Sequence, residues 1–189
     1  MRSHFLVALG VALSISVSIS AWAEVKTGTK ADPCDQRLPK SLKEVLHKAY
    51  PDYRVVSLSM LTVVGQRIYS RDSKSGCPGV AKVRFFDKNK VDYAIAITKR
   101  AEPQEISNVL VAKKGQNALW ALTILAIDVQ GAPPAVLALP PDKYTGYIDE
   151  SASRTLDSQN EAIFVVYYES SSLVYAVTER GIEKVWLSD

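Results

Sequence analysis

The side chains best suited to bind a metal ion lie in one short loop, Asp-Lys-Asn-Lys-Val-Asp at residues 87–92. Asp87, Asn89 and Asp92 place oxygen-bearing side chains at its first, third and sixth positions. Calcium takes six to eight oxygen ligands, and loops that alternate Asp or Asn with other residues supply them. The two lysines of the loop offset most of this carboxylate charge. The alternative to a calcium site is a turn in which Asp87 and Asn89 bond backbone amides.

The same loop resembles the acidic hairpin loop of FG-GAP and VCBS repeats. In that family a Phe-Asp-x-Asp/Asn-x-Asp-Gly-x-x-Asp turn joins two strands and often binds calcium. Phe86-Asp87, Asn89 and Asp92 match, and the Tyr-Ala continuation after Asp92 is similar. The turn here is shorter, lacks the glycine and contains lysines, and the chain has one such unit whereas a propeller needs several. The resemblance implies a hairpin of this style, with Asp87, Asn89 and Asp92 as candidate calcium ligands. As a whole, the chain resembles an exported bacterial domain.

No arrangement typical of an enzyme stands out. After residue 23, His47 is the only histidine, and it falls on the polar face of a predicted helix. The chain has no Gly-x-Ser-x-Gly motif, and one histidine cannot build a histidine-based zinc site. Carboxylates remain, because Asp149, Glu150 and Glu169 could converge for glycoside hydrolysis. No catalytic residue is assigned, and a carboxylate-dependent hydrolase is kept as an alternative.

Phosphate-binding glycine loops, nucleic-acid signatures and cofactor fingerprints are also missing from the sequence. We therefore expect no nucleic-acid partner and no cofactor, with calcium at residues 87–92 as the alternative.

Tyrosines are concentrated after residue 140. Exposed tyrosine beside Ser-rich turns is typical of a contact surface, because its amphipathic ring binds at low entropy cost. Alternatively, these rings fill the rim of a β-sheet core. Since side chains alternate along a strand, we expect one of Tyr167 and Tyr168 to face the core and the other to face outward. The candidate partner-binding residues are Tyr144, Tyr147, Tyr168, Glu169 and Tyr175.

Cys34 and Cys77 are the only cysteines. A redox-active pair normally has close spacing such as Cys-x-x-Cys, so this spacing favours a structural disulfide. In the chain-entropy model, closing the loop would stabilise the fold by about 4 kcal/mol.

Residues 1–23 predict a secretory signal, with Arg2, an apolar run and small residues before a cleavage point after Ala23. Removing these 23 of the 189 residues leaves 166, which is the size of one domain, at 24–189. With Arg2 lost, 22 basic residues face 20 acidic ones, a balance that demands neither nucleic acid nor an anionic membrane. We expect a periplasmic or secreted protein with no transmembrane segment after cleavage.

An amphipathic helix is predicted near the start of this domain. Ser41 and Glu44 have the spacing of a capping box, and Pro51 ends the helix. Its apolar positions recur with the helical period: Leu38, Leu42, Val45, Leu46 and Ala49.

Most of the remaining chain predicts strands. Residues 60–68 are apolar and predict one of them, whereas residues 143–160 are polar and predict a loop. Residues 80–86 and 92–98 predict a hairpin in which the alternate apolar positions of both strands share one face. The other predicted strands are 53–58, 109–111, 119–127, 135–139, 162–169, 173–178 and 182–188.

The predicted fold class is therefore α+β and mostly antiparallel β, a curved or closed sheet or meander with one N-terminal amphipathic helix packed on it. The function favoured is that of an exported non-catalytic binding protein, such as an inhibitor or immunity-type partner of an envelope enzyme. Its expected partner is an envelope or extracellular protein. The alternatives are a calcium-supported structural or adhesion module and the hydrolase.

Overall fold

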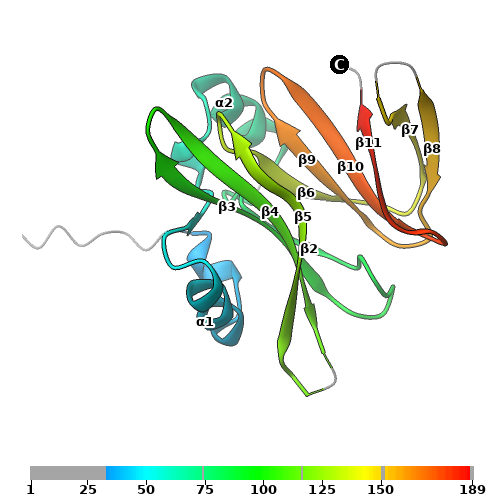
Figure 1. The fold of residues 1–189 in the computed structure, drawn as a ribbon, viewed down its shortest axis with the longest axis horizontal. Helices are drawn as coiled ribbons and strands as arrows, with labels where there is room; N and C mark the ends of the chain where they lie inside the picture. Colours follow the sequence, from blue (N-terminus) through cyan, green and yellow to red (C-terminus); the bar gives the residue numbers. More distant parts are fainter. Residues whose placement is uncertain (1–32, 74, 116, 150–151, 188–189) are drawn as a thin grey trace, which may run out of the picture. The chain divides into compact units, whose positions relative to one another are not determined.

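The computed structural model describes residues 33–73, 75–115, 117–149 and 152–187. The predicted signal at residues 1–23 lies outside them. Within these ranges the chain forms two antiparallel sheets and two α-helices, which confirms the α+β class with mostly antiparallel strands (Figure 1). The prediction of one curved or closed sheet with a single helix is wrong, because the strands divide between two open sheets.

The first sheet has the order β1-β3-β4-β5, and β2 pairs with β3 beside β1. Its central strand β3 is buried over residues 92–98, because both of its faces are covered. The predicted strands at 109–111 and 119–127 are confirmed as parts of β4 and β5. The members of this sheet are β1 (Arg54–Val55), β2 (Val80–Val83), β3 (Asp92–Ala101), β4 (Gln104–Lys114) and β5 (Trp120–Gln130).

The second sheet has the order β6-β9-β10-β11-β7-β8. The predicted strand at 135–139 and the three-stranded meander at the C-terminus are confirmed. Its members are β6 (Ala135–Leu139), β7 (Lys143–Tyr147), β8 (Ser153–Asp157), β9 (Ala162–Tyr167), β10 (Ser171–Thr178) and β11 (Gly181–Leu187).

The prediction of a loop over residues 143–160 is wrong, because β7 and β8 form a hairpin there. This segment is polar since its exposed positions face solvent, while Leu156 is 1% exposed in a small apolar cluster. Thr145 and Thr155 share a hydrogen bond between their hydroxyls at 2.7 Å across the two strands. Polar cross-strand pairs of this kind stabilise a hairpin without an apolar stripe.

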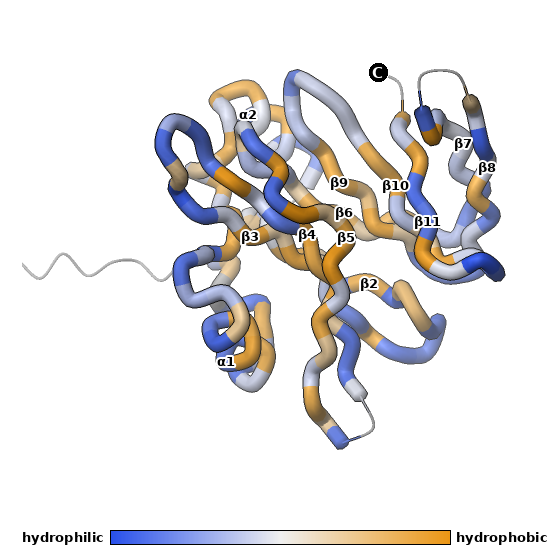
Figure 2. The backbone as a smooth tube through the Cα atoms, viewed as in Figure 1, coloured by the Kyte–Doolittle hydropathy of each residue, from blue (hydrophilic) through white to orange (hydrophobic). Residues whose placement is uncertain are grey.

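The main core lies between the two sheets, and Figure 2 shows hydrophobic residues along the strands that bound it. The first sheet and its β2–β3 loop contribute Phe85, Val109 and Val111 to this core. They pack with Ile163 and Val165 of β9, and all five side chains are fully buried. Burial of such side chains supplies the largest favourable contribution to folding.

Helix α1 (Lys40–Ala49) covers the opposite face of the first sheet. The predicted apolar stripe is confirmed where Leu42 and Leu46 pack against Ile95 and Leu110. The predicted capping box is wrong, because the residue before the first helical turn is Pro39, whose side chain makes no capping bond. Short 3₁₀ turns flank this region at η1 (Asp35–Arg37) and η2 (Leu58–Met60).

Helix α2 (Val63–Asp72) replaces the strand predicted at 60–68. Thr62 caps it by accepting a hydrogen bond from the Gly65 amide at 3.0 Å. Val63 is 73% exposed, so the apolar residues that predicted a buried strand lie partly on the solvent side of a helix. Tyr69 is the buried anchor of α2, and its hydroxyl donates to the Cys77 carbonyl at 2.7 Å.

The β2–β3 hairpin is confirmed, but the prediction that both strands share one apolar face is wrong. The register pairs Ala81 with Ala94 and Val83 with Asp92. Residues directly opposite each other lie on the same face of a sheet. Val83 therefore faces the core between the sheets, whereas Ile95 faces α1. In the sequence, the large apolar residues of β3 alternate with small alanines, a pattern that predicts one buried face. The alanines in fact occupy a second buried face.

The disulfide Cys34–Cys77 joins the start of the described chain to the turn before β2, and both cysteines are completely buried. The predicted pairing is thus present. None of the described helices has the length and apolar character needed to cross a membrane.

Candidate functional site

The loop between β2 and β3 has the geometry of a closed turn. Asp87 accepts a hydrogen bond on Oδ1 from the Asn89 amide at 2.9 Å, and Lys90 Nζ lies 3.6 Å from its Oδ2. The hydrogen bond from the Asn89 amide is the main reason that the pKa of Asp87 lies below its ordinary value, and Lys90 adds to this effect. Both carboxylate oxygens are therefore occupied by groups of the chain itself.

Asp92, the third candidate calcium ligand, is only 1% exposed. Its Oδ2 accepts a hydrogen bond from the Phe86 amide at 3.0 Å. Burial raises the pKa of Asp92, and the bond from Phe86 opposes that rise. The buried Asp92 carboxylate therefore joins the two ends of the loop between β2 and β3.

The surroundings of the loop are rich in lysine. A shallow cavity of about 490 Å³ next to it is lined by Lys90, Lys113 and Lys114. Within the described ranges, no group of three or more His, Cys, Asp or Glu side chains could hold a metal ion. The geometry is that of the backbone-bonding turn, in a positively charged setting.

The structure does not bring the candidate contact tyrosines together. Tyr144 and Tyr147 lie on β7, whereas Tyr168 and Glu169 lie at the turn between β9 and β10. The strands β10 and β11 stand between β9 and β7 in the sheet. With strands spaced about 4.8 Å apart, these two groups cannot form one small site.

Individually, the tyrosines differ in exposure. Tyr175 is 4% exposed in the core, where burial raises its pKa to about 12, so its ring is not presented to solvent. Tyr168 is partly buried against the core, and its ring lies directly over Gly65 of α2. Tyr167 is also partly buried and packs against the same core, so the expectation that only one ring of this pair does so is wrong. Tyr144 donates its hydroxyl hydrogen bond to the Pro140 carbonyl, and Tyr147 is 45% exposed beside Trp186 of β11.

The candidate carboxylates are also dispersed. Asp149 accepts a hydrogen bond from the Ala152 amide at 2.9 Å in the β7–β8 connection, and Glu150 lies among the residues that are not described. Glu169 is exposed at a turn position with φ of 71°. Asp149 and Glu169 therefore belong to connections in different parts of the sheet order.

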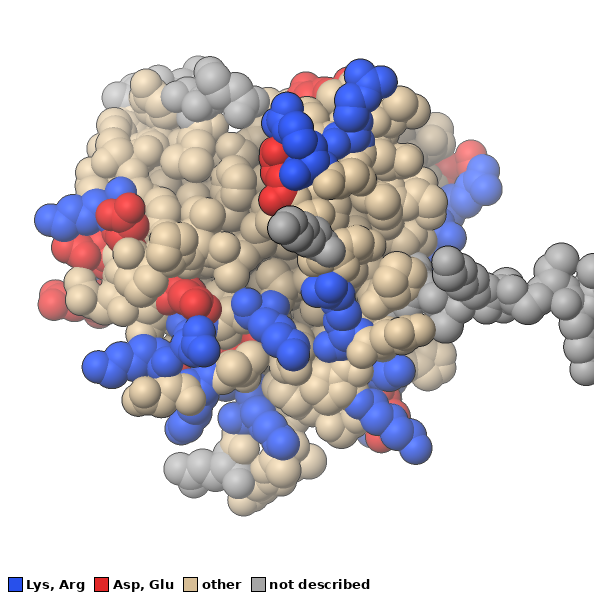
Figure 3. Space-filling model, turned by 180° about the vertical axis from the view of Figure 1, so that it is seen from behind, with Lys and Arg blue, Asp and Glu red and all other residues tan. Residues whose placement is uncertain are grey.

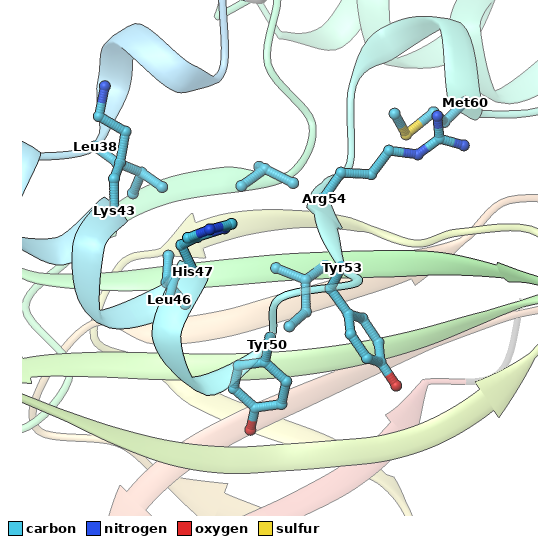
Figure 4. A pocket seen from close by; sticks show the side chains of 10 residues that line it. Leu38, Lys43, Leu46, His47, Tyr50, Tyr53, Arg54 and Met60 are labelled. Atoms are coloured by element: carbon cyan, nitrogen blue, oxygen red, sulfur yellow. The ribbon is translucent and has the colours of Figure 1, made fainter.

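A groove that sequence reasoning missed runs between α1 and the segment around β1 (Figure 4). Its volume is about 310 Å³. The apolar part of its lining comes from Leu38, Leu46, Val55, Met60 and Ile97. Its polar and aromatic part comes from Lys43, His47, Tyr50, Tyr53 and Arg54. We call it the α1 groove.

Two tyrosines form one wall of the α1 groove. The rings of Tyr50 and Tyr53 meet edge to face with their centroids 5.5 Å apart. Lys99 Nζ lies 5.0 Å from the centre of the Tyr53 ring, a cation–π distance. Burial raises the pKa of Tyr50, and the neighbouring Tyr53 adds to that rise. A protonated Tyr50 hydroxyl remains available as a hydrogen-bond donor at neutral pH.

The ionisable side chains that line the α1 groove, apart from the tyrosines, are Lys43, His47 and Arg54. Among its lining residues, all of which the structure describes, there is no Asp or Glu. Arg54 reaches out to Glu105, whose Oε1 lies 3.4 Å from Arg54 Nη2, and both side chains of this pair are partly exposed. The groove therefore favours a ligand group that carries negative charge.

The missed signal was present in the helix pattern. Lys43, His47 and Tyr50 follow one another at i, i+4 and i+7, a spacing that places them on one helix face. The pattern alone indicates only a polar helix face, because nothing in the sequence shows that Tyr53 and Arg54 fold back against it.

Basic side chains are not confined to the α1 groove. On the face seen from behind, Lys and Arg side chains gather across the lower half, with fewer acidic ones among them (Figure 3). One shallow cavity of about 350 Å³ includes Arg37 and Lys82 in its lining. The α1 groove differs from it in combining cations with an aromatic wall and an apolar floor.

In comparisons with known proteins, the chain matches no protein-family model, no curated protein and no solved structure.

Proposed function

We propose that this protein is an exported, non-catalytic binding protein whose partner is an envelope or extracellular protein, and that the α1 groove is its binding site. The observation that carries the proposal is the lining of the groove. Lys43, His47 and Arg54 stand beside the Tyr50–Tyr53 wall over an apolar floor, and the lining includes no carboxylate.

This lining has the features of a protein–protein contact. Tyrosine and arginine are enriched at the centres of interfaces, where an apolar ring and a polar tip both find partners. A volume of about 310 Å³ accommodates a few side chains of a partner and not an extended chain. The cations select an acidic side chain, because complementary charge mainly sets specificity and association rate.

The partner that we propose is an enzyme of the envelope, with this protein as its inhibitor or immunity-type partner. An acidic side chain at the rim of such an enzyme would enter the α1 groove. The disulfide Cys34–Cys77 is consistent with an oxidising compartment, where such partners are found.

The alternatives have less support. The calcium-supported module would need Asp87, Asn89 and Asp92 to turn toward one ion, yet Asp87 and Asp92 bond backbone amides. The hydrolase would need Asp149 and Glu169 to converge, and they lie in connections of different strand pairs.

The test uses the oxidised chain as bait in an envelope extract of its own source, with Lys43→Glu and Lys48→Glu as matched variants. Both lysines are exposed on α1, but only Lys43 is among the groove-lining residues. We expect a stoichiometric partner that is retained by Lys48→Glu and lost with Lys43→Glu. A second variant, Tyr53→Ala, should weaken the same capture, and a circular dichroism spectrum like that of the wild type is the check that this variant is folded.

Equal capture by Lys43→Glu and Lys48→Glu would contradict the assignment of the groove. Failure to retain any stoichiometric partner would contradict the binding function itself.

A further inference from the structure

The near-neutral balance of charge in the whole chain conceals an uneven distribution. Residues 31–130, which include the first sheet, contain 16 basic and 10 acidic residues. Residues 131–189, which include the second sheet, contain 4 basic and 9 acidic ones. Lys and Arg gather over the lower half of the molecule (Figure 3), and the turn between β4 and β5 is at its lower end (Figure 1). Most of the positive charge therefore belongs to the part of the chain that forms the first sheet.

Two connections lie side by side at this end of the first sheet. Tyr93, near the start of β3, pairs with Ala112, near the end of β4. The loop that enters β3 and the turn that leaves β4 are therefore neighbours, and residues of both line one shallow cavity of about 490 Å³. We call these segments, residues 86–91, 113–115 and 117–119, the basic end of the first sheet.

The basic end owes its charge to four exposed lysines, Lys88, Lys90, Lys113 and Lys114. Among the residues that the structure describes, Lys90 is the only one of the four with an ion-pair partner, Asp87, whose Oδ2 lies 3.6 Å from Lys90 Nζ. The second acid of this region, Asp92, is buried. Its acids therefore leave a net positive charge at the surface.

Two of these lysines are held in place by aromatic rings. Lys113 Nζ lies 4.8 Å from the centre of the Phe86 ring, and Lys114 Nζ lies 5.9 Å from the centre of the Trp120 ring. A cation–π contact orients an ammonium group without neutralising its charge. Successive residues of a strand point to opposite faces, so the two lysines place positive charge on both faces of the β4–β5 hairpin.

Apolar side chains project among these charges. Leu119 is 72% exposed in the turn, and Val91 is 44% exposed in the neighbouring loop. The turn is closed by its own backbone, because the Gly115 amide donates to the Leu119 carbonyl at 2.8 Å and the Ala118 amide donates to the Gly115 carbonyl at 3.2 Å. These backbone groups already have partners, so Leu119 can leave water without leaving them unpaired.

We propose that the basic end docks on the surface of an anionic lipid bilayer. The lysines are attracted to the acidic headgroups, and their apolar stems lie along the boundary with the acyl chains. Leu119 enters that boundary and loses its contact with water. Trp120 lies at the level of the headgroups, where aromatic rings are favoured, and its Nε1 donates to Ser41 Oγ of α1 at 3.0 Å. This bond fixes the ring to the fold, so insertion ends at the turn.

A bilayer surface matches both features of the basic end. A soluble polyanion would pair with the lysines, but it offers nothing to Leu119 and Val91. The boundary between charged headgroups and hydrocarbon accommodates cationic and apolar side chains that alternate within the same short segments. No residue of the basic end lines the α1 groove, so this docking does not depend on the proposed binding function.

The test is co-sedimentation with lipid vesicles. The protein is the chain from residue 24 with its disulfide closed, because the apolar run at 1–23 would itself bind lipid. We expect binding to vesicles of equal parts phosphatidylglycerol and phosphatidylcholine, and none to pure phosphatidylcholine. Binding should decrease strongly as salt approaches about 1 M, where the Debye length falls to about 3 Å.

Two pairs of variants separate the contributions of charge and apolar contact. Lys114→Glu should lower the partition coefficient about tenfold. Lys184→Glu is its matched control, since Lys184 Nζ lies 5.8 Å from the centre of the Trp186 ring in the second sheet. Leu119→Ser should also lower the coefficient about tenfold. Its matched control is Val63→Ser, because Val63 is 73% exposed on α2. Both controls should bind like the wild type.

The proposal is overturned if the wild type does not bind the anionic vesicles, or if each control weakens binding as much as its partner variant. It is also overturned if Leu119→Ser binds like the wild type and soluble polyphosphate competes fully with the vesicles. The basic end would then be a site for a soluble polyanion.

Discussion

The carboxylate of Asp92 accepts a hydrogen bond from the backbone amide of Phe86 at 3.0 Å, across the loop that joins β2 to β3. Asp92 opens β3 and pairs with Val83, the last residue of β2. A side chain that looked like a metal ligand in the sequence thus closes the hairpin, and its removal should reveal a structural role.

Asp92→Asn and Asp92→Ala should differ in stability. Asparagine keeps an acceptor for the Phe86 amide and removes the buried charge, so its free energy of unfolding at pH 7 should equal or exceed the wild-type value. Alanine leaves the amide without its acceptor and should cost about 1–2 kcal/mol. Urea unfolding of both variants measures the difference.

The pH dependence provides a control for that comparison. Because burial raises the pKa of Asp92, the folded state holds its proton more strongly than the unfolded state does. Its charged form therefore lowers stability above the unfolded pKa, and this loss is relieved as pH falls toward about 4. The Asn variant should lack this part of the profile. Equal losses in both variants at pH 7 would contradict the hydrogen-bond interpretation.

Calcium should leave the melting temperature unchanged. The Oδ1 of Asp87 is bonded to the Asn89 amide, its Oδ2 faces Lys90, and Asp92 is buried. Differential scanning calorimetry with calcium and with a chelator, on wild type and Asp87→Ala, checks this. A rise in melting temperature with calcium that disappears in Asp87→Ala would instead restore the loop as a metal site.

Gly79→Ala should destabilise the fold by about 2–3 kcal/mol. A Cβ at this position would lie 2.7 Å from the Val56 amide nitrogen and closer still to the Val56 carbonyl oxygen. These are backbone atoms, and both segments are bonded to Ala96: its amide donates to the Gly79 carbonyl, and its carbonyl accepts from the Val56 amide, so neither segment can shift freely.

Gly115→Ala is the matched control for Gly79, because its new Cβ would come no nearer than 3.4 Å to Leu119 O. Thermal unfolding should show a large decrease in melting temperature for the first variant and little change for the second. A small effect at both positions would mean that Val56 has room to move.

Alkaline pH should destabilise the protein through two tyrosines that pack in the main core, Tyr175 and the partly buried Tyr167. Burial raises the pKa of Tyr175 to about 12, and it raises that of Tyr167 further. The unfolded chain ionises near pH 10 while the folded chain keeps these protons, so stability falls as pH rises from about 10 to 12. Each such tyrosine contributes up to about 1.4 kcal/mol per pH unit.

Tyr175→Phe removes one of these protons and should flatten the alkaline decrease, whereas Tyr147→Phe at an exposed position should not. Urea unfolding at pH 9, 10 and 11 separates the two variants. Parallel profiles for both would show that Tyr175 ionises as readily in the fold as in the unfolded chain.

Local patterns predicted the elements whose burial is one-sided. The stripe of Leu38, Leu42 and Leu46 predicted α1, because one helix face meets the sheet. The predictions were wrong where a strand is buried on both faces, or where the exposed face of a hairpin is polar. Residues 92–98 face two apolar layers at once, and 143–160 form a hairpin with polar exposed positions. Sequence periodicity detects a difference in hydropathy between the two faces of a helix or strand. These two segments have little such difference, so the periodicity does not identify them correctly.

The sequence by itself determined the mostly antiparallel α+β class, the helix α1, the hairpin of β2 and β3, the C-terminal meander and the pairing of two cysteines. These depend on neighbours along the chain, or on there being only two thiols to pair. The tertiary structure alone decided the division into two sheets, the exposed edge of β5, and the meeting of Lys43 and His47 with Tyr53 and Arg54 in the α1 groove. The reason is physical. A groove or a free edge is formed by segments that are distant in the sequence, and the local sequence around each side chain does not indicate which residues it will contact in the fold.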